Sequence, residues 1–204
     1  MELNTDPEKK IMNAARKIFY EKGFKSATMR EIATEADTNL AMVNYYFRSK
    51  ENLFYIINDE TFTMLLGKVA LCIQEDIPIE QKITNIIHEY VDFFMINPHI
   101  PSFISGEIIR NPQKIATLMK EKISQSNIHK AFGIQIKKHV DEGIFKPHIT
   151  TLNIFINILS LTVFPILSQP IIKEAFNLSS EEYNEFIMGR KEEISQMIIN
   201  SIKV

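Results

Sequence analysis

The chain contains 204 residues, of which 45% are hydrophobic and 24% are charged, close to the averages of soluble globular proteins. This composition excludes an intrinsically disordered or low-complexity chain and predicts a packed core. The formal net charge of −2 argues against a protein that coats nucleic acid without selectivity, although one localised site remains possible. Cys72 is the one cysteine and no secretory leader opens the chain, so we expect a reducing, cytoplasmic location.

Glycine and proline are scarce, with 6 and 8 residues respectively, which favours long helices over a turn-rich array of strands. The sequence therefore predicts an all-α fold. The first expected helix follows Asp6 and Pro7, which suit a helix N-terminus, and Gly23 is placed to end it. Its apolar stripe contains Ile11, Ala14, Ala15, Ile18 and Phe19.

Two short helices are predicted next. Thr28 and Glu31 have the spacing of a capping box, in which each side chain satisfies a backbone N–H of the helix that follows. Residues 37–39 are turn-forming, residues 40–47 resume a helical pattern, and Ser49 begins another helix. Four helices therefore fit into the first sixty residues.

The remainder also reads as helical. Helical spacing holds over residues 83–94, stops at the prolines of 97–101, and returns after Pro112. Further helical patterns cover 132–143 and 149–172, and Ser179 caps a final helix that reaches Ile202.

The segment 149–172 has no charged side chain and exceeds the roughly 20 residues that cross a bilayer. Its Asn, Ser, Thr and Gln side chains and its two prolines would be costly against lipid, so a buried helix is favoured over a membrane span. Such a helix needs cover on every face, and a second copy of the chain would supply it.

Two short helices joined by a tight turn, with a third helix ahead of them, satisfy the geometry of a helix-turn-helix, although many small bundles share this spacing. The residues themselves resemble the DNA-binding domain of the TetR family of transcriptional regulators. The resemblance rests on residues 14–19 (AARKIF), 21–24 (EKGF), 27–33 (ATMREIA) and 43–54 (VNYYFRSKENLF). It implies a DNA-binding domain over residues 1–48 and a ligand-binding and dimerisation domain over 49–204.

The resemblance also implies which residues contact a double-stranded DNA operator. Residues 40–46 would form the recognition helix, and the tyrosine hydroxyls and the Lys50 ammonium would reach phosphates. Thr28 suits a helix cap better than a DNA contact. The predicted DNA-binding set is Thr28, Arg30, Asn39, Leu40, Ala41, Met42, Asn44, Tyr45, Tyr46 and Lys50.

The turn departs from the family pattern. Asp37 and Thr38 stand where the family usually has glycine and an aliphatic residue, and Asn44 stands where tyrosine is common. Asp tolerates the positive φ that such a turn needs, so the turn is expected to form. Because residues 40–42 offer only apolar or backbone contacts, recognition would rely on few polar side chains together with DNA shape.

The larger region is expected to hold an effector pocket and a dimer surface. Aromatic residues with two polar anchors would suit an apolar small molecule, although ordinary core packing explains each of them as well. The predicted ligand-binding set is Tyr90, Phe94, His99, Phe103, Glu107 and Phe132. Dimerisation is assigned to the helices near 152–167 and 181–202, the latter through Phe186, Ile194, Met197, Ile198 and Ile202.

No catalytic residues, metal site or cofactor are predicted. The five histidines form no i, i+4 pair, no glycine-rich phosphate loop is present, and Cys72 has no neighbours that would activate a thiol. The resulting hypothesis is a homodimeric repressor that a small-molecule effector releases from its operator. The alternatives are an activator, a regulator without effector, and an all-helical ligand carrier or enzyme that does not bind DNA.

Overall fold

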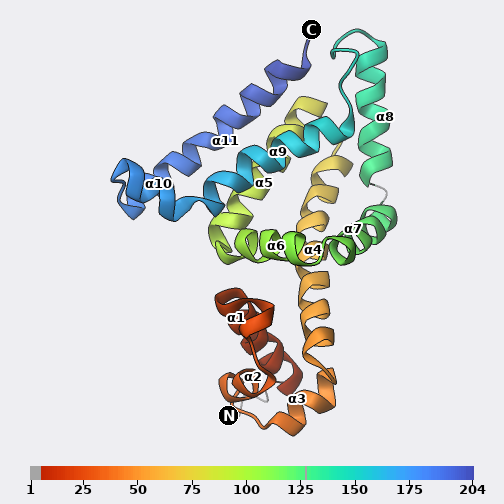
Figure 1. The fold of residues 1–204 in the computed structure, drawn as a ribbon. Helices are drawn as coiled ribbons and strands as arrows, with labels where there is room; N and C mark the ends of the chain where they lie inside the picture. The colour runs from red at the N-terminus through yellow and green to blue at the C-terminus, as the bar shows by residue number, and fades with distance from the viewer. Residues whose placement is uncertain (1–5, 127) are drawn as a thin grey trace, which may run out of the picture.

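The computed structural model describes residues 6–126 and 128–204, and eleven α-helices make up the secondary structure of this part (Figure 1). The predicted all-α fold is confirmed. In chain order the helices are α1 (Pro7–Ser26), α2 (Met29–Glu35), α3 (Leu40–Phe47), α4 (Lys50–Gln74), α5 (Ile79–Ile96), α6 (His99–Arg110), α7 (Pro112–Ser126), α8 (Ile128–Asp141), α9 (Thr151–Leu167), α10 (Gln169–Phe176) and α11 (Ser180–Ile202).

The predicted helix boundaries near the N-terminus are confirmed. The side chain of Asp6 caps α1, and Gly23 breaks its helical geometry with a φ of 73° before one further turn ends at Ser26. Both hydrogen bonds of the Thr28 and Glu31 capping box are present at the start of α2. Side-chain caps at the starts of α3 and α4 make this part of the chain a set of short, sharply bounded helices.

Helix α4 links two units of the molecule. Helices α1, α2 and α3 lie at the level of its N-terminal half, while α5 to α11 lie at the level of its C-terminal half, with α10 and α11 farthest from it (Figure 1). The N-terminal unit has its own hydrophobic core, to which α4 contributes Leu53, Phe54 and Ile57. The larger core lies among α4, α5, α8, α9 and α11. A single rigid helix therefore runs through both cores.

Helix α6 was not predicted, because Pro98 and Pro101 suggested a break at residues 97–101 and the helical pattern was resumed only at Pro112. The structure places Pro101 in the first turn of α6, where the missing N–H of proline has no helical partner to lose. The two prolines therefore begin a helix rather than interrupt one. This helix lies across the junction between the two units (Figure 1).

The uncharged segment 149–172 forms two helices instead of one. Helix α9 ends at Leu167, just after Pro165, and α10 leaves it at an angle of 63°. Within the described residues no single helix is long and apolar enough to cross a membrane, although this bent pair passes by length and composition. One chain alone does not cover every face of α9, since Leu152 and Phe164 are each 65% exposed. Cover of this face by a second copy stays a prediction.

Candidate DNA-binding surface and effector cavity

The α2–turn–α3 unit fixes the orientation of α3. Val43 and Phe47 are buried and attach one face of α3 to the N-terminal core. The side-chain oxygen of Asn39 accepts a hydrogen bond from the Met42 amide at 2.9 Å, which fixes the start of the helix. Asp37 adopts a φ of 50° in the turn, as expected from its place in the family pattern.

The opposite face of α3 is open to solvent. Tyr45 is 77% exposed, and its ring lies edge-on to Tyr46 with centroids 5.3 Å apart. Ala41 and Asn44 are also exposed, whereas Leu40, Met42 and Tyr46 are partly exposed. All six predicted residues of this helix therefore keep surface that is open to solvent, although Tyr46 also packs against the N-terminal core.

Two further predicted contacts lie on and before α2. Arg30 is exposed. Thr28 accepts a hydrogen bond from the Glu31 amide, and its hydroxyl donates to the Glu31 carboxylate, so it acts as a helix cap. Hydrogen bonds from the Lys22 side chain and then from Thr28 hold the pKa of Glu31 below its usual range.

Lys50 occupies a different environment from the one predicted. Its ammonium donates hydrogen bonds to the carbonyl oxygens of Phe24 at 2.9 Å and Ala27 at 3.0 Å, at the end of α1. It also lies 4.4 Å from the centroid of the Phe24 ring. Two of the three ammonium hydrogens of Lys50 are therefore used in bonds within the N-terminal unit. The third can still bind another partner.

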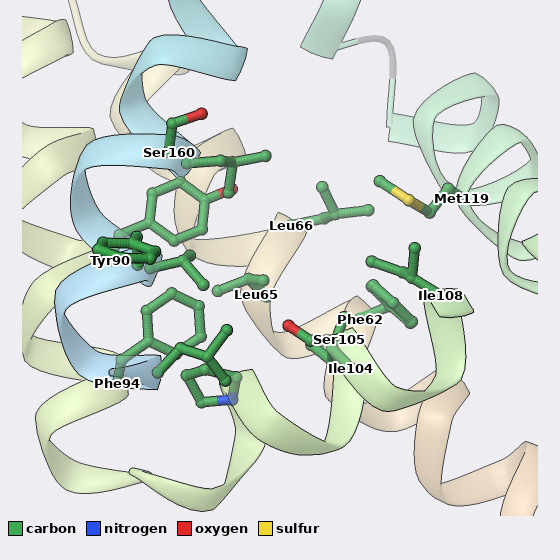
Figure 2. A pocket seen from close by; sticks show the side chains of 15 residues that line it. Phe62, Leu65, Leu66, Tyr90, Phe94, Ile104, Ser105, Ile108, Met119 and Ser160 are labelled. Atoms are coloured by element: carbon green, nitrogen blue, oxygen red, sulfur yellow. The ribbon is translucent and has the colours of Figure 1, made fainter. Parts of the chain in front are cut away.

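A cavity of about 340 Å³ opens in the larger unit among α4, α5, α6, α7 and α9 (Figure 2). Tyr90, Phe94 and Ser160 lie on one side of it, and Ile108 and Met119 lie across from them. A second cavity of about 180 Å³ adjoins it. The two share Leu66, Tyr90, Met119 and Leu159 as lining residues.

Only two of the predicted ligand residues line these cavities, namely Tyr90 and Phe94. His99 is exposed at the start of α6, and Phe132 is fully buried in the larger core. Phe103 points the other way from the cavity-lining side of α6 and belongs to the N-terminal core, against Tyr20 and Phe54. These three residues therefore lie outside the cavity wall.

Glu107, predicted as a polar anchor for a ligand, is buried without lining the cavity. Its carboxylate accepts hydrogen bonds from the Arg110 guanidinium at 2.6 and 3.0 Å and from the Asn111 side chain at 2.8 Å. These bonds occupy both of its oxygens, so Glu107 braces the end of α6. Arg110 and Asn111 stand three and four residues after Glu107, a spacing that becomes informative only once residues 99–110 are known to be helical.

Among the residues that the structure describes, no group of three or more His, Cys, Asp or Glu side chains is arranged to hold a metal ion. The side chain of His129 lies outside those described. Cys72 is buried, and burial raises the pKa of its thiol, which opposes formation of a nucleophilic thiolate.

Comparison with known proteins agrees with this geometry. Residues 11–55 match the family model of bacterial regulatory proteins of the tetR family, and residues 80–198 match that of the tetracyclin repressor-like C-terminal domain. The second match alone spans more than half of the chain. The chain belongs to the TetR family.

Curated relatives of this TetR-family chain are distant but align along most of it. The probable HTH-type transcriptional regulator YttP of Bacillus subtilis is 25% identical over 179 residues, which is 85% of this chain and 83% of YttP. The HTH-type transcriptional repressor NicS of Pseudomonas putida is 24% identical over 76% of this chain and 73% of NicS. This TetR-family chain is accordingly a DNA-binding transcriptional regulator and not an enzyme.

Solved structures share the fold of this TetR-family chain. The putative transcriptional regulator SCO4942 from Streptomyces coelicolor superposes with a TM-score of 0.70 at 18% identity, covering 97% of this chain and 98% of the other. The residues that sequence reasoning missed are those of the cavity wall, above all Leu66, Ile104 and Met119. Their apolar character is the same as that of core residues, so only the packing of helices distinguishes them.

Proposed function

We propose that this regulator is a homodimeric, cytoplasmic repressor that leaves its operator when an apolar small molecule enters the cavity of the larger unit. The observation that carries this proposal is the two-sided placement of α6. Pro101, Ile104 and Ile108 line the cavity, while Phe103 of the same helix packs in the core of the DNA-binding unit.

This placement supplies a physical route from effector to DNA. Phe103 meets the rings of Tyr20 in α1 and Phe54 in α4 with centroids 5.0 and 5.2 Å apart. A ligand that displaces α6 therefore moves a side chain on which the orientation of α1 depends. Only a ligand that binds one orientation more tightly shifts the population, so the cavity must differ between the DNA-bound and released states.

The proposed dimer surface uses α9 and α11, which pack side by side. Phe164 of α9 is 65% exposed, and Phe186 and Met197 of α11 are 42% and 49% exposed. Ile194, Ile198 and Ile202, which were assigned to the same surface from sequence, are buried within the protomer and do not reach it. Two such helix pairs would form a four-helix bundle and place the two α3 helices about 34–36 Å apart, one turn of DNA.

DNA binding is tested with duplexes from the region upstream of the chain's own gene, by gel shift and fluorescence anisotropy at several salt concentrations. We expect one tight, near-palindromic site and a steep fall of affinity with salt. Equal affinity for a scrambled duplex would contradict the proposal. Tyr45→Ala should weaken operator binding about tenfold. Tyr55→Ala, at a 38% exposed position of α4 whose ring faces the Lys114 ammonium, should leave it unchanged.

The dimer is tested by sedimentation velocity. Met197→Glu places a carboxylate on the proposed surface and should yield monomers with weakened operator binding. Met64→Glu is the matched control, because Met64 is similarly exposed, at 54%, but lies on α4 away from α9 and α11. A monomeric wild-type chain at working concentration would refute this part of the proposal.

A further inference from the structure

The two adjoining cavities are apolar along their whole length. Their walls contain Leu, Ile, Val, Phe, Met and Pro, and the polar residues among them are Tyr90, Ser105 and Ser160. Among the side chains that the structure describes, none that lines either cavity is charged. An ionised group bound there would lose its hydration without gaining a counter-ion, which is strongly unfavourable.

Of the three polar side chains of this wall, Tyr90 alone lines both cavities, whereas Ser105 and Ser160 line the larger one only. Tyr90 is 4% exposed, and within residues 6–126 and 128–204 its hydroxyl makes no hydrogen bond, although its ring stacks on Phe94. By contrast, the hydroxyl of buried Tyr183 donates to the Pro165 carbonyl at 2.9 Å. Burial raises the pKa of Tyr90, so the hydroxyl stays neutral and able to donate at physiological pH.

The Tyr90 side chain lies where the two cavities meet. Tyr90 lines both cavities, as do Leu66, Met119 and Leu159, so these four residues surround the place where the cavities meet. An extended molecule that occupies both cavities passes the Tyr90 side chain. The volume of the larger one, about 340 Å³, is within the range of small-molecule sites, about 300–1,000 Å³.

We propose that the effector is an elongated, uncharged molecule with an apolar body that spans both cavities and one neutral oxygen that hydrogen-bonds to the Tyr90 hydroxyl. This inference rests on the proposed effector role of the cavity. It assigns Tyr90 as the residue that selects a hydroxyl- or carbonyl-bearing ligand. The uncharged walls select against carboxylates and quaternary ammonium ions.

The test uses three probes that share a ten-carbon chain and differ in charge: 1-decanol, decanoate and decyltrimethylammonium. Each is titrated calorimetrically into the full chain below its micelle concentration. We expect saturable binding of 1-decanol and at least tenfold weaker binding of both ions. Equal or tighter binding of either ion, or no binding of 1-decanol up to its solubility limit, would overturn the proposal.

Two variants locate the site. Tyr90→Phe removes one oxygen and keeps the ring, so 1-decanol should bind about threefold to tenfold more weakly, the contribution of one neutral hydrogen bond. Unchanged affinity would overturn the assignment of Tyr90. Leu66→Trp fills the place where the cavities meet and should abolish binding. Leu71→Trp, at a 66% exposed position of the same helix, should not. Unfolding curves of each variant show that a loss of binding does not arise from unfolding.

Operator release separates this inference from the proposed function. The same probes are added to the operator complex, and anisotropy is recorded. If 1-decanol binds selectively but does not release the operator, the inferred ligand class is correct for the cavity. The proposed release of DNA by ligand is then wrong. If decanoate releases the operator as well as 1-decanol does, the proposed release of DNA by ligand is supported. The inference that the effector is uncharged is then wrong.

Discussion

The ammonium of Lys50 lies 4.4 Å from the ring centroid of Phe24 and donates a hydrogen bond to the carbonyl oxygen of the same residue. This contact joins the first residue of α4 to the end of α1, on either side of the helix-turn-helix in the chain. Family resemblance assigned Lys50 to a DNA phosphate. Its internal bonds also hold the end of α1 against the start of α4.

Replacement of Lys50 by Met should therefore destabilise the chain by about 1–3 kcal/mol, because the Phe24 and Ala27 carbonyls lose their donor. Urea unfolding measures this change. Lys25→Met is the control, since Lys25 is exposed in the last turn of α1. If Lys50→Met leaves stability unchanged but lowers the salt dependence of operator binding by about one counter-ion, the phosphate role is the correct one.

Phe103 offers a test of the contact between the two units. Phe103→Ala removes a ring that is 5% exposed and packs on Tyr20 and Phe54, which should cost about 3–5 kcal/mol of unfolding free energy. Denaturant titration followed by circular dichroism records the loss. Ile109→Ala changes an 81% exposed position on the same helix and should cost little. Similar losses for the two variants would argue against the packing role of Phe103.

Asp37 tests the conformation of the turn. Its φ of 50° lies in the left-handed region, which glycine adopts without steric cost. Asp37→Gly should raise the unfolding free energy by about 0.5–1 kcal/mol. Asp37→Ala keeps the β-carbon and loses the polar side chain, so it should not stabilise the chain. The difference between the two melting temperatures is the measurement, and a more stable alanine variant would contradict a left-handed turn.

Acidification should weaken the α2 cap. Hydrogen bonds from Lys22 and Thr28 lower the pKa of Glu31 in the folded chain below its ordinary value of 4.5. Glu31 therefore stabilises the fold fully above that value, and its contribution is lost as the pH falls through the lower folded pKa. Urea unfolding at pH 7 and pH 3 should show a smaller pH dependence for Glu31→Gln than for the wild type. If the free energy of unfolding depends on pH equally in Glu31→Gln and in the wild type, other carboxylates cause the loss of stability at low pH.

Local patterns were sufficient for much of the N-terminal unit. The capping box at Thr28, the break at Gly23 and the positive φ at Asp37 all depend on interactions between residues close in the chain, and all three are present. The helix α6 was missed because its prolines have opposite effects at the start and in the middle of a helix. Distinguishing these positions requires the packing of α6 against α1.

The sequence by itself determined that the chain is helical and which side of α3 faces outward, and the resemblance to the TetR family identified the helix-turn-helix near Thr28 to Phe54. The first two properties follow from periodicity and capping within single helices. Tertiary structure alone decided that Lys50 bonds to carbonyl oxygens at the end of α1, that Phe103 packs outside the cavity, and that Tyr90 lines both cavities. These outcomes depend on contacts between residues far apart in the chain, which no local pattern specifies.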